Sequence, residues 1–504
     1  MVTSAPALPF KRPPRPRGRD IDRLGLVELL HDFVRSDALI ELCETLPHLP
    51  REDEGVSVRP VGRRPYFPPE AMVLFGVLTS QIHGDRNVER FLRDPHVWEP
   101  VRAHLAPLFP QYAGLAPGAP GPNRSQFMRW YSKIAEEPEL LSTFAASFQA
   151  SAIHLARSMD LFDPERRSPS RPDIRDTMIG DGTILKSRFR AAPGEKQVDR
   201  ETGELVPRRF DPDATFQHRK GDDELIRLDV AGSNFGFLHG TTGEPGESIV
   251  VSMFHVPQGK GNSEAKSAME QLLHLRDHGL PGISHLLYDK AMRGTHIDRA
   301  FAHGIYLHAK VSKVAGGKTK ERMIDAQVEA RRGTDVVGTV DIVAVGGAAH
   351  IRVPIADQLE LIQLDPRQVR ERLSRRTGAL RVYRDYAIPD DIRVPERLRG
   401  AIVTVRHTSN EDDEQRGLKR TEVLRVIAET HDDWTVAAQR SRAESLNAQI
   451  KNRWQDKRAP AVGKERQLLR LLFAGLAINF QAVTTYDRRT MRVEAAPPPE
   501  PAAA

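Results

Sequence analysis

Residues 440–451 read RSRAESLNAQIK, a run without Gly or Pro. Its Ala, Leu, Gln, Arg and Lys residues favour a helix. At about 100° per residue, four polar side chains share an arc of roughly 60°; they are Arg440, Glu444, Asn447 and Lys451. A neighbouring apolar stripe is formed by Val436, Ala443, Leu446, Ile450 and Trp454. The predicted helix therefore packs on a core, and its polar stripe either faces solvent or holds a phosphate beside a metal.

The composition describes a soluble globular protein rather than a secreted or membrane protein. The chain has 504 residues, 39% of them hydrophobic and 28% charged, which leaves room for two to four domains with sizeable cores. The net charge of +6 favours a polyanionic partner. Because Cys43 is the single cysteine, a disulfide framework and a cysteine-rich zinc site are excluded. We expect a reducing, cytoplasmic location.

No stretch of the sequence predicts a membrane span. The longest apolar run, around Leu471–Ile478, is far shorter than the ~20 residues that cross a bilayer. Residues 1–20 are basic and rich in Pro, without the apolar core of a signal peptide. They are predicted to be a disordered basic arm.

Residues 21–165 have helical periodicity and are predicted to form an all-helical domain. One expected helix starts after the capping residue Asn123 and carries Arg124 and Arg129 on its exposed face. Short helices with basic faces are what a helix-turn-helix DNA reader requires. They also occur in many plain helical domains, so DNA binding is a hypothesis for this region.

Two aspartates occupy positions suited to catalysis. Thr177–Thr183 is predicted to be a short buried strand containing Asp181, and a buried carboxylate is costly unless it is paired or binds a metal. Ile283–Lys290 is an apolar strand that ends at Asp289, just before a helix. A turn aspartate and a helix-capping aspartate are the respective alternatives. Residues 187–224 are polar and are predicted to be a loop, followed by antiparallel strands at Leu225–Val230, Asn234–His239 and Ser248–His255. Three antiparallel strands, helix, strand, helix and strand is the order of an RNase-H-like α/β core, which we assign to residues 173–315 and 430–485.

About 155 residues separate Asp289 from Glu444, far more than one strand–helix connection requires. Residues 316–429 are therefore predicted to be a β-rich insertion, with a hairpin at Gly346-Gly347. Its expected strands are Val336–Val345, Ala349–Val353, Leu359–Leu364, Leu380–Tyr386, Ile402–His407 and Val423–Ala428. Gly316–Arg322 is a basic loop that suits phosphate contact. After a further helix at Lys464–Phe480, residues 486–504 are predicted to be a disordered tail.

Three short motifs resemble those of DDE transposases of insertion-sequence family four. They are Asp181-Gly182-Thr183, Tyr288-Asp289 followed by Arg293-Gly294, and Arg-x3-Glu-x6-Lys at Arg440, Glu444 and Lys451. The family has a Tyr where this chain has Ala437, so the third motif matches at three of its four positions. The resemblance implies an RNase-H-like core with a β-rich insertion.

The resemblance also implies chemistry at two Mg²⁺ ions about 3.5–4 Å apart, for which Mn²⁺ substitutes. Such hard cations prefer oxygen ligands. Asp181 would bridge the ions, and Asp289 and Glu444 would bind one each. Asp176 is an alternative to Asp181, and Glu429, Asp432 and Asp433 are alternatives to Glu444.

The implied partner is double-stranded DNA, both the terminal inverted repeats of an element and target DNA, bound by a homodimer. Arg440, Lys451, Arg293, Arg124 and Arg129 are the predicted contacts to DNA phosphates. The expected activity is metal-dependent DNA cleavage and strand transfer. The alternatives are an inactive DNA-binding descendant of a transposase and an RNase-H-like nuclease without strand transfer.

Overall fold

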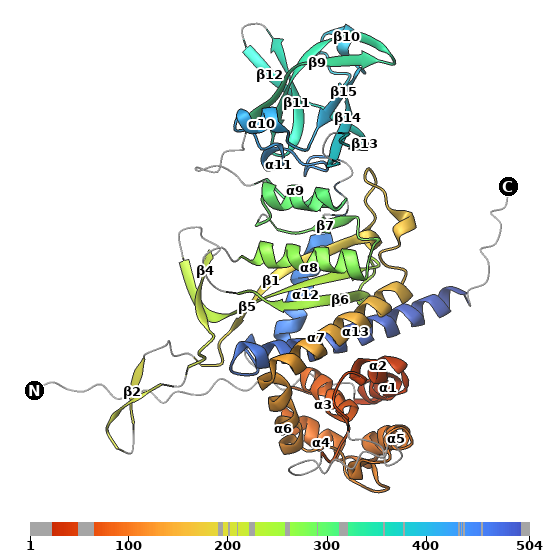
Figure 1. Ribbon diagram of the computed structural model, residues 1–504, viewed down its shortest axis with the longest axis vertical. Helices are drawn as coiled ribbons and strands as arrows, with labels where there is room; N and C mark the ends of the chain where they lie inside the picture. Colours follow the sequence, from red (N-terminus) through yellow and green to blue (C-terminus); the bar gives the residue numbers. More distant parts are fainter. Residues whose placement is uncertain are drawn as a thin grey trace, which may run out of the picture.

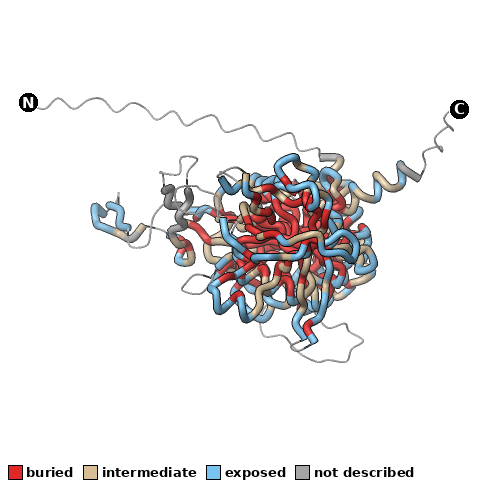
Figure 2. The backbone as a smooth tube through the Cα atoms, turned by 90° about the horizontal axis from the view of Figure 1, so that it is seen from above, coloured by how far each residue is buried: buried red, intermediate tan, exposed pale blue. Residues whose placement is uncertain are grey.

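The computed structural model shows an elongated mixed α/β molecule with helices at one end, a central α/β layer and a second sheet at the other end (Figure 1). Buried residues concentrate along its middle and exposed residues surround them (Figure 2). The structure describes residues 23–48, 65–189, 195–199, 202–208, 210–220, 227–257, 263–289, 291–311, 321–355, 358–375, 378–431, 434, 436, 439–454 and 457–494. The predicted basic arm at 1–20 lies outside these residues.

The N-terminal region consists of helices, as its periodicity predicts. The α-helices are α1 (Arg23–Arg35), α2 (Asp37–Cys43), α3 (Pro69–Ile82), α4 (Asp85–Leu92), α5 (Pro95–Leu105), α6 (Arg124–Glu136) and α7 (Pro138–Ser158). The side chain of Asn123 accepts a hydrogen bond from the backbone N–H of Gln126, which caps α6 as expected. Gly76 of α3 permits close packing, since a Cβ there would lie 2.7 Å from the ring of Phe473.

Phe473 belongs to α13 (Lys464–Glu494), which runs between the helical region and the central sheet (Figure 1). Among the described helices, α13 is long and apolar enough to cross a membrane, but 67% of its apolar window is buried inside the protein. This burial is typical of a core helix. The prediction of a tail from residue 486 is wrong for its first part, because α13 continues to Glu494; residues 495–504 lie outside the described residues.

The central sheet combines antiparallel and parallel strands. Its strands are β1 (Thr177–Lys186), β4 (Thr215–Lys220), β5 (Arg227–Thr241), β6 (Ser248–His255), β7 (His285–Leu287) and β8 (Tyr306–His308). The order is β4-β5-β1-β7-β8, and β6 also pairs with β5. Strands β1, β5 and β6 pair antiparallel, whereas β1, β7 and β8 pair parallel. Its helices are α8 (Glu264–His278), α9 (Gly294–Ala302) and α12 (Ser441–Asn452).

Some details of this region differ from prediction. The two strands expected at Leu225–Val230 and Asn234–His239 are the single long strand β5, which exchanges partners from β4 to β6 along its length. The stretch 187–224, expected to be a loop, contains β4 and a small hairpin of β2 (Lys196–Val198) and β3 (Leu205–Pro207). Strand β7 is shorter than expected, because pairing stops at Leu287 and leaves Asp289 two residues beyond the strand.

The second sheet has the strand order β12-β11-β10-β9-β15-β14-β13. Its strands are β9 (Glu321–Arg332), β10 (Asp335–Val345), β11 (Ala348–Ile355), β12 (Gln358–Gln363), β13 (Asp365–Leu373), β14 (Leu380–Ala387) and β15 (Ile402–Arg406). Five of the six predicted strands are present, and Gly346-Gly347 is the predicted turn between β10 and β11. The predicted strand at Val423–Ala428 is wrong: α11 (Arg420–Val423) ends there, and irregular chain follows.

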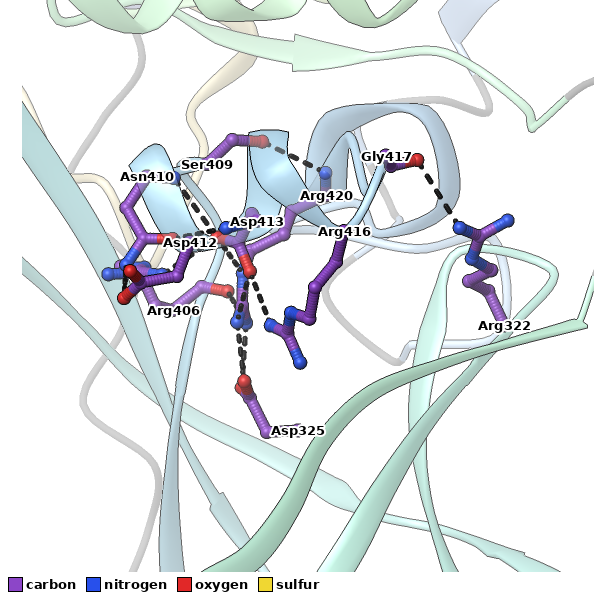
Figure 3. Close-up of polar contacts among 10 residues, drawn as sticks. All are labelled: Arg322, Asp325, Arg406, Ser409, Asn410, Asp412, Asp413, Arg416, Gly417 and Arg420. Atoms are coloured by element: carbon purple, nitrogen blue, oxygen red, sulfur yellow. Dashed lines mark hydrogen bonds and ion pairs between the residues drawn. The ribbon is translucent and has the colours of Figure 1, made fainter.

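A buried ion network holds α10 (Glu411–Gln415) and α11 on this sheet (Figure 3). The Asp413 side chain, 0% exposed, accepts hydrogen bonds from Arg406, Arg416 and Arg420 at 2.7–3.0 Å. Arg420, 2% exposed, also pairs with Asp325 of β9. Helix α11 then packs on α9, where a Cβ at Gly294 would lie 2.6 Å from the side chain of Glu422. The network therefore links the second sheet to the helix that follows Asp289.

Candidate active site

Asp181 of β1 and Asp289, two residues after the parallel strand β7, lie near one another at the same end of the central sheet. The parallel register pairs Thr177 with His285 and Ile179 with Leu287. Continuing it by two residues brings Asp181 alongside Asp289, and adjacent strands lie about 4.8 Å apart. Ile179 and Leu287 pack together against Ala443 of α12. Because side chains alternate along a strand, Asp181 points to the same face as Ile179, toward α12, where Asn447 donates a hydrogen bond to it.

The environment of Asp181 favours its protonated form. Burial raises the pKa of Asp181, and the negative charge of Asp289 raises it further. Three groups oppose this effect: the side chain of Asn447, the backbone N–H of Gly182 and the positive charge of Arg440. Asp289 is half-buried and accepts a 2.7 Å hydrogen bond from the backbone N–H of Ala291, so it also caps the turn before α9.

The polar stripe of α12 faces Asp181. Asn447 Nδ2 donates to Asp181 Oδ2 at 2.9 Å and to the Gly182 carbonyl at 3.1 Å. Arg440, one residue before the helix, is half-buried and acts on the pKa of Asp181. Glu444 lies on the same stripe, between Arg440 and Asn447. Lys451 lies in the last turn of α12 and is half-buried. The apolar stripe is buried, as predicted from the sequence.

The oxygen atoms of Asp181 and Asp289 are ligands of the type that a hard cation prefers, although the third predicted ligand, Glu444, is exposed. Asp181 and Asp289 supply carboxylate oxygens, and Asn447 Oδ1 is buried without a hydrogen-bond partner in the described part of the chain. Within the described ranges, no three His, Cys, Asp or Glu side chains are arranged to hold a metal ion. The structure thus brings together two of the three predicted ligands, with the third on the facing helix.

The alternative carboxylates are placed less favourably. Asp176 is buried and accepts a 2.9 Å hydrogen bond from Arg166, so its carboxylate is already paired. Glu429 is exposed and pairs with Lys310. Asp432, Asp433 and Ala437 lie outside the described residues, as does most of the predicted basic loop at Gly316–Arg322.

Two features of the candidate site were not predicted from the sequence. Asn447 was recognised as part of the polar stripe, but its hydrogen bond to Asp181 was not foreseen. The carboxylate of Glu264 lies on the face of β1 opposite to Asp181. Burial raises the pKa of Glu264, and the charges of Asp289 and Asp181 raise it further. The glycines on both sides of Asp181 are the signal that was available, because they leave room for a group behind the strand.

The other predicted phosphate contacts are spread over the molecule. Arg293, just before α9, is exposed and lies four residues after Asp289. Arg124 and Arg129 are exposed on α6 of the helical region. Arg124 helps to line a hollow of about 300 Å³ between α4 and α6, whose lining residues are Arg86, Glu89, Arg90, Arg93, Arg124 and Ser125. With four arginines and one glutamate, this basic hollow is suited to an anion.

Comparison with known proteins gives no further guide, since no protein-family model and no curated protein matches the chain.

Proposed function

We propose that this protein is a DDE-type DNA transposase, which binds the ends of its element and carries out Mg²⁺-dependent phosphodiester cleavage and strand transfer. The observation that carries the proposal is the pair Asp181, on β1, and Asp289, two residues after the neighbouring parallel strand β7. Asp181 accepts a hydrogen bond from a helix whose polar stripe also holds Arg440, Glu444 and Lys451. The spacing of these motifs resembles that of insertion-sequence family four.

The arrangement of the central sheet supports an RNase-H-like core. Three antiparallel strands, β6, β5 and β1, continue into two parallel strands, β7 and β8, with α8 between β6 and β7. The sequence predicted the same succession of antiparallel strands, helix and strand, but two of its three antiparallel strands, Leu225–Val230 and Asn234–His239, are the single strand β5. The chain between β8 and α12 contains the second sheet, which occupies the place of the family's β-rich insertion.

The residues of the site divide into metal-binding and phosphate-binding groups. Two Mg²⁺ ions, when bound, stabilise charge on the attacking and leaving oxygens. Asp181, Asp289 and Glu444 would hold them through carboxylate oxygens. Arg440 and Lys451 flank this group along α12 and would orient the phosphate of the DNA strand. The basic hollow between α4 and α6, which includes Arg124, would contact DNA backbone away from the reaction.

The test is nicking of a supercoiled plasmid that carries the DNA flanking the gene on both sides. Wild-type protein should nick it with Mg²⁺ or Mn²⁺, and not with EDTA. Asp181→Asn, Asp289→Asn and Glu444→Gln should each lower the rate at least about 100-fold, because each removes a carboxylate that would hold a Mg²⁺ ion. Glu429→Gln is the matched control and should retain the wild-type rate. Wild-type-like nicking by Asp181→Asn would reject the assigned site.

A second candidate function is DNA-end binding without cleavage. The specific observation in its favour is that Glu444 is exposed, while Asn447 holds Asp181. Sequence-specific binding without cleavage under any divalent metal would select this function. Transfer of labelled ends into a target plasmid would in turn distinguish a transposase from a nuclease.

A further inference from the structure

Two side chains from other elements occupy the face of β1 opposite to Asp181, because Gly180 and Gly182 carry no side chains there. A Cβ on Gly182 would lie 1.9 Å from Glu264 Oε2, and a Cβ on Gly180 would lie 2.6 Å from Cε2 of Tyr288. Real Cβ atoms do not approach so closely. The two glycines therefore make room for these two side chains directly behind Asp181.

Glu264 and Tyr288 bind one another in this space. The Tyr288 hydroxyl donates to Glu264 Oε1 at 2.9 Å, and Asn234 Nδ2 of β5 donates to Glu264 Oε2 at 3.2 Å. Tyr288 is 1% exposed, and its pKa is well above the ordinary value, because of burial first and then the nearby carboxylates. The hydroxyl therefore remains a hydrogen-bond donor at neutral pH.

Tyr288 immediately precedes Asp289, and its ring lies on the face of β1 opposite to Asp181. Strand pairing with β1 ends at Leu287, so the backbone of Asp289 lies beyond the ladder that fixes β7. The hydrogen bond from Tyr288 to Glu264 anchors this unpaired end to the start of α8. A second hydrogen bond, from the Tyr288 backbone N–H to the His308 carbonyl at 3.2 Å, ties the same end of the chain to β8.

We propose that Glu264 is a positioning residue of the active site: through Tyr288 it keeps Asp289 beside Asp181 in the geometry that metal binding needs. This inference rests on the proposed function. Glu264 itself lies on the far side of β1 and would not touch metal or DNA. Groups that orient metal ligands typically change metal affinity about 10- to 100-fold when removed.

The experiment measures Mn²⁺ binding to the full chain by electron paramagnetic resonance, which needs no DNA and no activity. Tyr288→Phe keeps the ring and removes the hydroxyl, and Glu264→Ala removes the acceptor. Each should weaken Mn²⁺ binding about tenfold. Glu264→Gln retains an oxygen that accepts from Tyr288 and should bind within about threefold of wild type. A purely packing role would lower the melting temperature of the variants and leave Mn²⁺ affinity unchanged.

A second pair of variants covers the case in which Tyr288→Phe does not fold. Gly182→Ala should displace Glu264 and weaken Mn²⁺ binding, but it should add no further loss to Glu264→Ala, because the close contact is then gone. Independent, additive losses would overturn the inference, as would wild-type Mn²⁺ affinity in folded Tyr288→Phe. If Asp181→Asn also binds Mn²⁺ like wild type, it is the proposed function that fails.

Discussion

Asp413→Asn should loosen the second sheet, because Asp413 is the centre of its buried ion network (Figure 3). Burial raises the pKa of Asp413, but the hydrogen bond and charge of Arg420, together with Asn410 and Arg406, outweigh burial and lower it from 3.8 to about 2. A shift of this size corresponds to about 2 kcal/mol. Since the folded pKa is the lower one, this stability is present above about pH 4 and is lost as the pH falls toward 2.

The substitution should cost more than this linkage, about 3–5 kcal/mol, because it leaves Arg420 with a single carboxylate partner, Asp325, in a buried site. Hydrogen-exchange mass spectrometry of the full chain is the suitable assay, since it reports the opening free energy of each segment separately. Protection should fall in β9, β15 and α10, and not in the helical region.

Asp412→Asn is the matched control, with the same charge change on the next residue, which is exposed. Its exchange should match wild type within about 0.5 kcal/mol. Equal protection in Asp413→Asn and Asp412→Asn at neutral pH would refute the reasoning, as would acid loosening of β9 and β15 that begins well above pH 4.

Three further outcomes follow from the structure. Asp181→Asn should raise the melting temperature at pH 7 and abolish nicking. Burial and the charge of Asp289 raise the pKa of Asp181, so ionisation of this carboxyl lowers the stability of the fold as the pH rises above its unfolded pKa. An unchanged or lower melting temperature would contradict this. Gly180→Ala should destabilise the fold by about 1–3 kcal/mol, measured by thermal unfolding, because its Cβ meets the ring of Tyr288, and unchanged stability would place that ring elsewhere. Arg90→Ala, in the basic hollow, should lower DNA affinity for all sequences alike and reduce the slope of log affinity against log salt by about one; an unchanged slope would remove this hollow from the DNA-binding surface.

Local patterns predicted much of the site. The helix at residues 440–451 is uninterrupted and amphipathic, and α12 occupies Ser441–Asn452 with the expected stripes. The strands that carry or precede Asp181 and Asp289 were also predicted, because apolar runs with Gly-rich turns are strong local signals. That the two aspartates are neighbours depends on the pairing of β1 with β7, which is a tertiary contact and has no local pattern.

The incorrect predictions for the second sheet also have physical causes. Strands β9 and β13 were not predicted, because they are rich in charged side chains and largely exposed, so they lack an apolar alternation. Val423–Ala428 was predicted to be a strand from its apolar content, yet Arg425 within it is buried. Its guanidinium donates to the carbonyls of Ala309, Thr421 and Leu424, so the side chain stabilises an irregular chain that no ladder supports.

The three carboxylates of the candidate site are positioned in two different ways. Asp181 and Asp289 are held from the sheet, since Ile179 and Leu287 fix their strands on one face and Tyr288 with Glu264 fills the other. Glu444 depends instead on where α12 packs, which is set by Ala443 against Ile179 and Leu287 and by the hydrogen bond from Asn447 to Asp181. The position of Glu444 relative to the two aspartates is therefore set by the packing of α12, whereas the aspartates are positioned by the paired strands that carry or precede them.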